Sequence, residues 1–272
     1  RTSDKSSAVL FRIREHTIQA LPGVLPHPFI DGASGTGPNV TIANPLSIEN
    51  NMRVSVAYAM APTDRITLEM IFQHGTPHTA SLDGQAGGTV VFSLSNAILA
   101  RCVNSIVCLR YSVLRNGQTT PSNVQTVTFG TIAAANLPQP LINNIANGGT
   151  LDLNTFSGNA TASVAKWRLS ATGQRVWLIC SSAGVGDLYV LNGVAITATE
   201  AANGLINKTV LRTWLGILPT GSQITVTCKV TFDGGGDEER AVIFPTTLYT
   251  AITTPKLEFV STPKPLATTI CT

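Results

Sequence analysis

Residues 52–58 read MRVSVAY, and in this stretch apolar and polar residues alternate. The same period of two recurs in RITLEM at residues 65–70 and in VQTVTF at residues 124–129. A period of two places one face of a β-strand on a core and the other face in water. We therefore expect half-buried strands in all three segments.

Turn-forming dipeptides separate the alternating segments. Asp83-Gly84, Asn116-Gly117 and Asn192-Gly193 each supply a residue that adopts a positive φ at little steric cost, as hairpin turns require. Helical spacing is restricted to short segments near residues 96–101 and 197–205. The sequence predicts an all-β protein with many short strands, which means a sandwich or a barrel.

Composition excludes several classes of protein. The chain has 272 residues, of which 12% are charged and 43% are hydrophobic, and its formal net charge is +3. Because the usual charged fraction is about 25%, a disordered charged tail and a coiled coil are both excluded. Lys and Arg do not cluster with interleaved aromatic residues, so we expect no nucleic-acid partner. Apolar runs stay far below the ~18 residues that span a bilayer, so we expect no membrane insertion.

The second half of the chain repeats the first half. Four matched segments keep the same order, with offsets between 109 and 117 positions: residues 25–31 with 137–143, 65–70 with 175–180, 82–84 with 191–193, and 113–117 with 230–234. A repeat of about 110 residues has the size of one seven-stranded sandwich. We predict two tandem immunoglobulin-like antiparallel β-sandwiches, residues 21–135 and 136–252.

The two ends of the chain echo parts of the repeat. AVLF at residues 8–11 resembles AVIF at 241–244, and PKPL at 263–266 resembles PQPL at 138–141. We expect residues 1–20 to be a terminal strand or linker of a preceding module, and residues 253–272 to be a linker or the start of a further module. The alternative is two ordinary tails. Residues 6–14 could also complete a neighbouring sheet by strand exchange.

A family resemblance rests on five features of the first repeat. They are the Leu-Pro-x-Pro opening, the strand at 52–58, TDRITL at 63–68, the turn at 82–84, and LRYSV at 109–113 followed by RNG at 115–117. This pattern resembles the tandem bacterial immunoglobulin-like repeat modules of large pseudomonad surface and secreted proteins. The resemblance covers nearly all of residues 21–252 and is weaker in the second repeat.

The resemblance implies spacer or adhesive units and brings no catalytic residues and no cofactor. We expect a non-catalytic structural or adhesive segment of an extracellular or cell-surface protein, next to further modules of the same array. Two alternatives stay open. One is a module that recognises a particular protein or glycan, and the other is the delivery or scaffold part of a larger toxin or enzyme.

Two histidines and one tryptophan are the candidate binding residues. His74 and His78 lie in HGTPH, where Gly75 and Pro77 forbid the helix that would place both imidazoles on one face of a zinc site. The two histidines are either ordinary exposed loop residues or, in the recognition alternative, residues that contact a ligand. Trp177 alternates out of step with its apolar neighbours, so we expect it to face outward and either bind a ligand or pack against the linker or the other module.

Carboxylates surround a triple glycine at residues 233–239. Such a loop is either a weak calcium site or a solvated turn in which Lys229 and Arg240 offset the negative charge. The spacing matches no calcium-loop motif, so we expect no metal. The sequence alone leaves calcium binding by this loop open.

Cys180 and Cys228 occupy inward positions on facing or neighbouring strands of the second repeat. They form either a disulfide or two free buried thiols, and the sequence does not distinguish the two. Cys108 alternates with apolar residues and is expected to face outward. Cys271 lies near the end of the chain.

Overall fold

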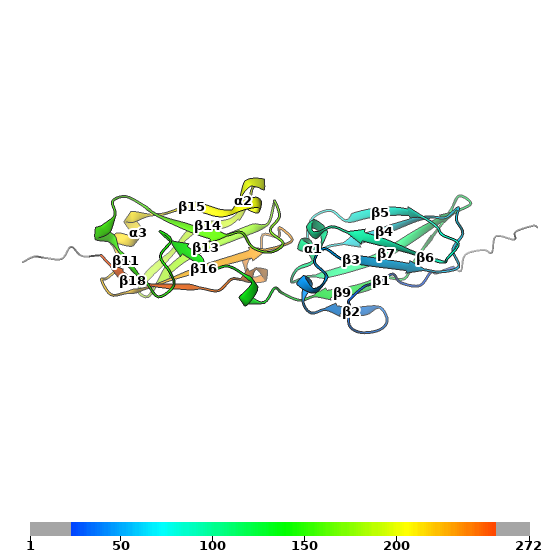
Figure 1. Cartoon of the computed structure of the whole chain (residues 1–272), viewed down its shortest axis with the longest axis horizontal. Helices are drawn as coiled ribbons and strands as arrows, with labels where there is room; N and C mark the ends of the chain where they lie inside the picture. Colours follow the sequence, from blue (N-terminus) through cyan, green and yellow to red (C-terminus); the bar gives the residue numbers. More distant parts are fainter. Residues whose placement is uncertain (1–22, 254–272) are drawn as a thin grey trace, which may run out of the picture.

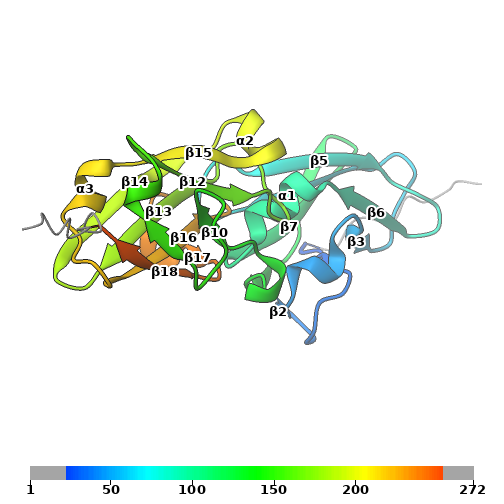
Figure 2. The ribbon, with the colours of Figure 1, turned by 60° about the vertical axis from the view of Figure 1, so that its left-hand side comes forward.

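The computed structural model describes residues 23–253. The expectations for residues 1–20 and for the last nineteen residues lie outside this range, as do strand exchange through residues 6–14 and the state of Cys271. Within it, two β-sandwiches follow one another along the long axis of the molecule (Figures 1 and 2). The all-β prediction and the two tandem immunoglobulin-like sandwiches are confirmed.

The first module consists of two sheets. The smaller sheet has the order β1-β3-β6, made of β1 (Phe29–Ile30), β3 (Met52–Ala57) and β6 (Thr89–Leu94). The larger sheet has the order β2-β9-β7-β4-β5, made of β2 (Asn39–Ile42), β9 (Gln125–Phe129), β7 (Ile106–Arg115), β4 (Arg65–Ile71) and β5 (His78–Asp83), with β8 (Gln118–Pro121) paired to β7.

The second module repeats this arrangement. Its smaller sheet has the order β10-β12-β15, made of β10 (Pro140–Ile142), β12 (Ala160–Ala165) and β15 (Gly204–Val210). Its larger sheet has the order β11-β18-β16-β13-β14, made of β11 (Thr150–Asp152), β18 (Thr247–Ile252), β16 (Gln223–Thr231), β13 (Arg175–Ser182) and β14 (Val185–Ala195), with β17 (Val242–Ile243) paired to β16.

Short helices connect some of the strands. They are η1 (Pro45–Ile48), α1 (Asn96–Cys102), η2 (Ala134–Asn136), η3 (Leu153–Thr155), α2 (Ala198–Asn203), α3 (Arg212–Gly216) and η4 (Glu238–Arg240). α1 and α2 fall in the two segments with helical spacing, whereas α3 was not anticipated. Within residues 23–253, the helices are too short to cross a bilayer.

Alternation in the sequence becomes alternation in burial. Val54 and Val56 of β3 are fully buried, while Arg53, which points to the opposite face of the strand, is exposed. The strand register is also repeated: Leu68 pairs with Tyr111 between β4 and β7, and Leu178 pairs with Cys228 between β13 and β16. The sequence repeat therefore reflects a repeat in three dimensions.

One strand pair in each module departs from the antiparallel arrangement. β2 runs parallel to β9, and β11 runs parallel to β18. In the first module β1 and β2 belong to different sheets, so the chain crosses between the layers after Ile30. Gly32, Gly35 and Gly37 have positive φ values in this crossing, which explains the glycine-rich sequence there.

A buried ion pair closes the outer end of the first module. The Arg115 guanidinium bonds to both oxygens of Asp64, with Nε–Oδ1 at 2.6 Å and Nη2–Oδ2 at 2.7 Å. Tyr58 donates its hydroxyl proton to Asp64 at 2.8 Å, and Ala61 donates its backbone N–H at 2.9 Å. In the second module the equivalent polar contact is uncharged, because Trp167 Nε1 donates to Gln174 Oε1 at 3.0 Å.

The surroundings of Asp64 decide its protonation. Burial alone raises the pKa of its carboxyl group, but the hydrogen bonds from Arg115, Ala61 and Tyr58 outweigh it and hold the pKa below its ordinary value. A carboxyl group whose pKa is lowered by folding stabilises the folded state above the unfolded pKa, and this contribution is lost as the pH falls. The ion pair is thus a stabilising element of the first module at neutral pH.

We predict that Arg115→Ala lowers the free energy of unfolding of the first module by about 3–5 kcal/mol, because it leaves the Asp64 carboxylate buried without its cation. Since all three tryptophans lie in the second module, denaturation followed by circular dichroism should show an earlier first transition while the tryptophan fluorescence transition moves little. Arg65→Ala is the matched control, because its ion pair with Asp83 is exposed and is expected to contribute less than about 1 kcal/mol. Equal losses in both variants would contradict the assignment.

Candidate functional site at the joint between the modules

The joint between the modules begins with a short, partly buried linker. η2 forms its centre, and Leu137, directly after η2, is buried. Leu137 N–H bonds to Ala134 O at 3.0 Å, which closes the 3-10 turn. The buried apolar residues of both modules form one connected cluster, so the cores meet through the joint.

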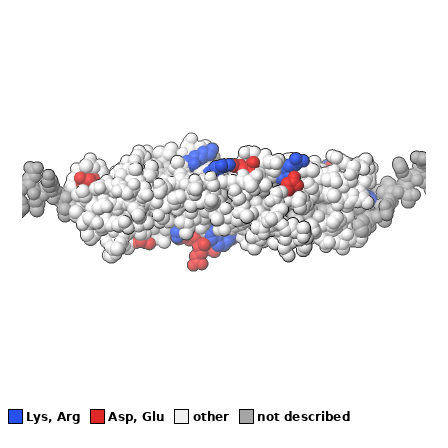
Figure 3. All heavy atoms as spheres, turned by 60° about the horizontal axis from the view of Figure 1, so that its bottom comes forward, with Lys and Arg blue, Asp and Glu red and all other residues white. Residues whose placement is uncertain are grey.

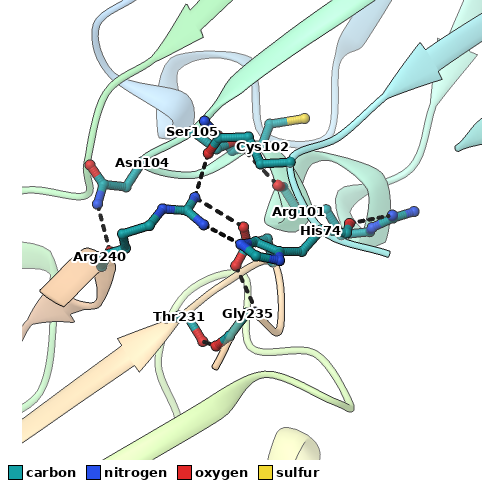
Figure 4. Close-up of polar contacts among 10 residues, drawn as sticks. His74, Arg101, Cys102, Asn104, Ser105, Thr231, Gly235 and Arg240 are labelled. Carbon is teal, nitrogen blue, oxygen red and sulfur yellow. Dashed lines mark hydrogen bonds and ion pairs between the residues drawn. The ribbon is translucent and has the colours of Figure 1, made fainter. Parts of the chain in front are cut away.

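A long connector in the second module supplies the main contact surface. Ten residues separate β16 from β17, whereas two residues separate the equivalent strands β7 and β8 of the first module. The additional residues include the triple glycine and η4. This connector lies at the end of the second module that faces the first module (Figures 1 and 4).

Arg240 of η4 reaches across to the first module. Its guanidinium bonds to His74 Nε2 and to Gln73 Oε1, both in the connection between β4 and β5. Its backbone carbonyl accepts from Asn104 Nδ2 at 2.9 Å, and within its own module Nη2 lies 3.2 Å from Asp233 Oδ2 (Figure 4). One residue therefore carries three contacts between the modules.

Polar contacts within the connector hold Arg240 in place. Asp233 Oδ1 accepts from Gly235 N–H at 3.0 Å, and Thr231 donates its hydroxyl proton to Gly235 O at 2.6 Å. Lys229 forms an ion pair with Glu238 at 2.7 Å. The carboxylates of this loop thus serve ion pairs and backbone turns, and within residues 23–253 no three metal-ligating side chains converge on one point.

Arg101 of α1 fixes the opposing surface in the first module. Its Nη2 donates to His74 O at 3.2 Å and to Thr76 O at 2.7 Å. Its guanidinium carbon lies 3.7 Å from the centre of the Phe72 ring, as in a cation–π contact. The loop that carries Gln73 and His74 is therefore held against α1 by contacts within the first module, independently of Arg240.

A second ion pair and a groove complete the joint. Arg168 of the second module pairs with Glu49 of the first. Figure 3 shows charged side chains gathering near the middle of the molecule on the face that it presents. A groove of about 590 Å³ runs along the joint, with His74, Arg101, Ala97, Gln174, Phe232 and Asp233 among its lining residues. Solvent therefore reaches the edge of the polar contacts.

The two candidate histidines separate in the structure. His74 is half-buried in the joint against Arg240, whereas His78 begins the edge strand β5 and pairs with Met70 in the ladder. The two imidazoles thus do not share one exposed surface, because Arg240 of the second module contacts His74, and ligand binding by these residues stays a prediction. Nothing in the sequence near His74 signals this contact, since its partner lies 166 positions away.

Trp177 faces away from the sandwich core, as its position in the strand predicts, but only 3% of its surface is exposed. It packs with Ile179 and with Ala241, which follows η4 in the same connector. A Cβ at Gly193 would lie 3.1 Å from the indole ring, so the neighbouring strand also closes over it. The binding alternative therefore lacks an exposed indole surface, and Trp177 packs instead against the connector of its own module that forms the joint.

The cysteines in residues 23–253 are free thiols. Cys180 and Cys228 both point into the core from the adjacent strands β13 and β16, but Cys180 pairs with Val226 and Cys228 pairs with Leu178. They are therefore diagonal neighbours on adjacent strands. The Cα atoms of such neighbours lie about 7–8 Å apart, which is longer than the Cα–Cα distance that a disulfide allows. The structure thus has the free-thiol alternative, and Cys108 faces outward as expected.

The central residues of the joint carry a sequence signal that is visible only by comparing the repeats. Arg240 and Asp233 lie in a connector that is eight residues longer than its equivalent in the first repeat. An insertion in one repeat marks a position at which the structures of the two modules differ. The signal identifies the connector, but it does not identify Gln73, His74 and Asn104 as its partners.

No family model matches the sequence, and no curated protein matches it. In structure, the chain is similar to a two-domain fibronectin type III segment of chicken tenascin, with a TM-score of 0.34 and 10% identity over 80% of this chain and 96% of that one. A tetra-tandem repeat from the extending region of a large adhesion protein gives 0.38 and 16% over 79% of this chain and 49% of that one. A bacterial ice-binding adhesin of 1.5 MDa gives 0.27 and 12% over 85% of this chain and 67% of that one.

We predict that Cys180 and Cys228 both react with an alkylating reagent after the chain is denatured without a reductant. In the folded protein both stay unreactive, because burial raises the pKa of the Cys180 thiol to about 12 and raises that of Cys228 as well. Mass spectrometry of the two peptides measures this, with the partly exposed Cys108 as the thiol that reacts in the folded state. Unmodified peptides joined by a disulfide would contradict the free-thiol assignment.

We predict that Gly235→Ala disturbs the joint while leaving both sandwiches folded. A Cβ at this position would lie 2.7 Å from Cδ2 and 3.0 Å from Nε2 of His74, so the imidazole must shift and its contact with Arg240 is disturbed. NMR shifts of the His74 ring measure the displacement. Gly236→Ala is the matched control, since its Cβ would meet nothing within 4 Å. If both variants leave the His74 signals unchanged, the close contact does not exist in solution.

Proposed function

We propose that this chain is a stiff, non-catalytic spacer segment of an extracellular or cell-surface protein, in which the two sandwiches hold neighbouring parts apart at a fixed orientation. The observation that carries the proposal is the Arg240 contact set, which joins the modules by hydrogen bonds in addition to the linker. Linked domains with a small or loose interface are expected to move relative to one another. Direct contacts of this kind oppose that motion.

The path of the chain supports a spacer. Residue 23 lies at the outer end of the first module and residue 253 at the outer end of the second, at opposite poles of the molecule (Figure 1). The strands of both modules run along the same long axis. Further modules attached at either pole would extend the array in line, and neighbouring modules are accordingly the partners that we propose.

The chemistry of the described side chains supports a non-catalytic role. Cys102, Cys180 and Cys228 are buried, and burial raises the pKa of each thiol, so none of them is a ready nucleophile. At the joint, Arg240, Asp233 and Arg101 are engaged in contacts that hold the protein together. An adhesive role, and an origin in bacterial surface or secreted repeats, remain part of the proposal on the strength of the residue pattern in the first repeat.

We predict that the two modules of the full chain tumble as one elongated body near neutral pH, and that Arg240→Ala makes them tumble separately. The substitution removes the contacts to Gln73, His74 and Asp233 together. ¹⁵N relaxation measures this, because one shared diffusion tensor describes a rigid pair and two shorter correlation times describe a loose pair.

Arg65→Ala is the control for the same experiment. It removes an exposed arginine at the outer end of the first module and should leave the shared tumbling intact. Separate tumbling of the modules in the unmodified chain would refute the stiff-spacer proposal. Shared tumbling that survives Arg240→Ala would locate the stiffness elsewhere, in the linker or the Glu49–Arg168 pair.

A further inference from the structure

We infer that His74 makes the stiffness of the joint depend on pH: the neutral imidazole closes the joint on Arg240, and the protonated imidazolium releases it. The inference rests on the proposed stiff spacer and specifies how that spacer is regulated. It would turn a rigid pair of modules into a flexible one in mildly acidic surroundings.

The first step of the argument is the direction of the hydrogen bond. A guanidinium carries its charge at all relevant pH values and has five N–H donors and no acceptor. His74 Nε2 must therefore accept the proton that Arg240 Nη1 offers. Nε2 can accept only when the ring is neutral with its proton on Nδ1, so the contact selects one protonation state and one tautomer.

The second step is the effect of protonation. An imidazolium donates from both nitrogens and has no acceptor, so the bond to Arg240 is lost and two cations face each other. Two like charges in a partly buried site repel more strongly than in water. The bonds of Arg240 to Gln73 and Asn104 and the Arg168–Glu49 pair still connect the modules, but the contact between Arg240 and the His74 ring is gone.

Several charged groups lie near His74 on both sides of the joint. From the second module it faces Arg240 and Asp233, and the Asp233 carboxylate is already paired with Arg240 at 3.2 Å. From the first module Arg101 donates to the His74 carbonyl, and Gln73 beside it is uncharged. Arg175 of β13 donates to Gly234 O at 3.2 Å, behind the same connector. Of these charged groups, Arg240 is the one that bonds to the imidazole ring itself.

The third step is access to protons. His74 is half-buried and lines the groove of about 590 Å³ along the joint, so its ring exchanges protons with solvent without unfolding. Histidine is the side chain whose ordinary protonation falls between about pH 5 and 8. Carboxyl groups ordinarily titrate near about pH 4, so mild acidification reaches imidazoles before it reaches carboxylates.

The test follows ¹⁵N relaxation of the full chain from about pH 8 to about pH 5.5, a range in which imidazoles protonate and carboxylates do not. We expect shared tumbling at the upper end and loss of shared tumbling at the lower end, with circular dichroism unchanged. Long-range ¹H–¹⁵N spectra of the imidazoles identify the protonation state of His74 at each pH. Loss of shared tumbling should coincide with protonation of His74.

Two glutamine variants separate His74 from every other titrating group. In His74→Gln the amide oxygen accepts from Arg240 at any pH, so we expect shared tumbling to persist throughout. His78→Gln is the matched control, because His78 lies four residues further on in β5 and takes no part in the joint. It should keep the full pH dependence of the unmodified chain.

The outcomes distinguish this inference from the proposed function. Shared tumbling at both ends of the pH range would overturn the pH dependence and leave the stiff spacer standing. A pH dependence that survives in His74→Gln would also overturn it and assign the effect to another group. Separate tumbling already at about pH 8 would refute the stiff spacer itself.

Discussion

The fixed positive charge of Arg240 constrains the whole joint. A guanidinium that is partly withdrawn from water needs acceptors on several sides, and it cannot lose its proton to avoid the cost. Its own module supplies one acceptor in Asp233, whose side chain is 5% exposed. The remaining acceptors, Gln73 and His74, belong to the other module. Satisfying one cation therefore requires both modules to be in place, which is why the joint has a defined geometry.

The two repeats share a register and differ at their ends. At the outer end of the first module, Arg115 and Asp64 form a closed ion pair, and a two-residue turn leaves no extension beyond it. At the corresponding end of the second module, Trp167 bonds to the uncharged Gln174, and the turn has grown into the ten-residue connector. The first arrangement stabilises one module by itself. The second presents donors and acceptors to a neighbour.

Sequence reasoning predicted what depends on near neighbours in the chain. Alternation at residues 52–58 and 65–70 gave β3 and β4, and the matched segments gave two sandwiches with the same strand register. The outward direction of Trp177 also follows from alternation. Its burial does not, because the cover comes from Ala241 on a connector that folds back over the sheet.

The contacts at the joint could not be predicted from the sequence for the same physical reason. His74 was recognised as a loop residue from the glycine and proline beside it, but its environment is set by Arg240, 166 positions later. Periodicity and turn chemistry describe interactions within a few residues, whereas contacts between modules depend on which ends meet. The unequal length of the β7–β8 and β16–β17 connections was the available signal, and it needed a second repeat for comparison.

A polar joint is also a selective one. Apolar contact alone, such as that through which the two cores meet, would hold modules together, but it would also bind any similar patch that was exposed during folding or in a neighbouring chain. Arg240 instead requires a partner that offers hydrogen-bond acceptors at the right positions, as Gln73 and His74 do. A neighbour without them leaves the guanidinium short of acceptors, which penalises the wrong pairing. The hydrogen bonds at the joint therefore favour this order of modules along the chain.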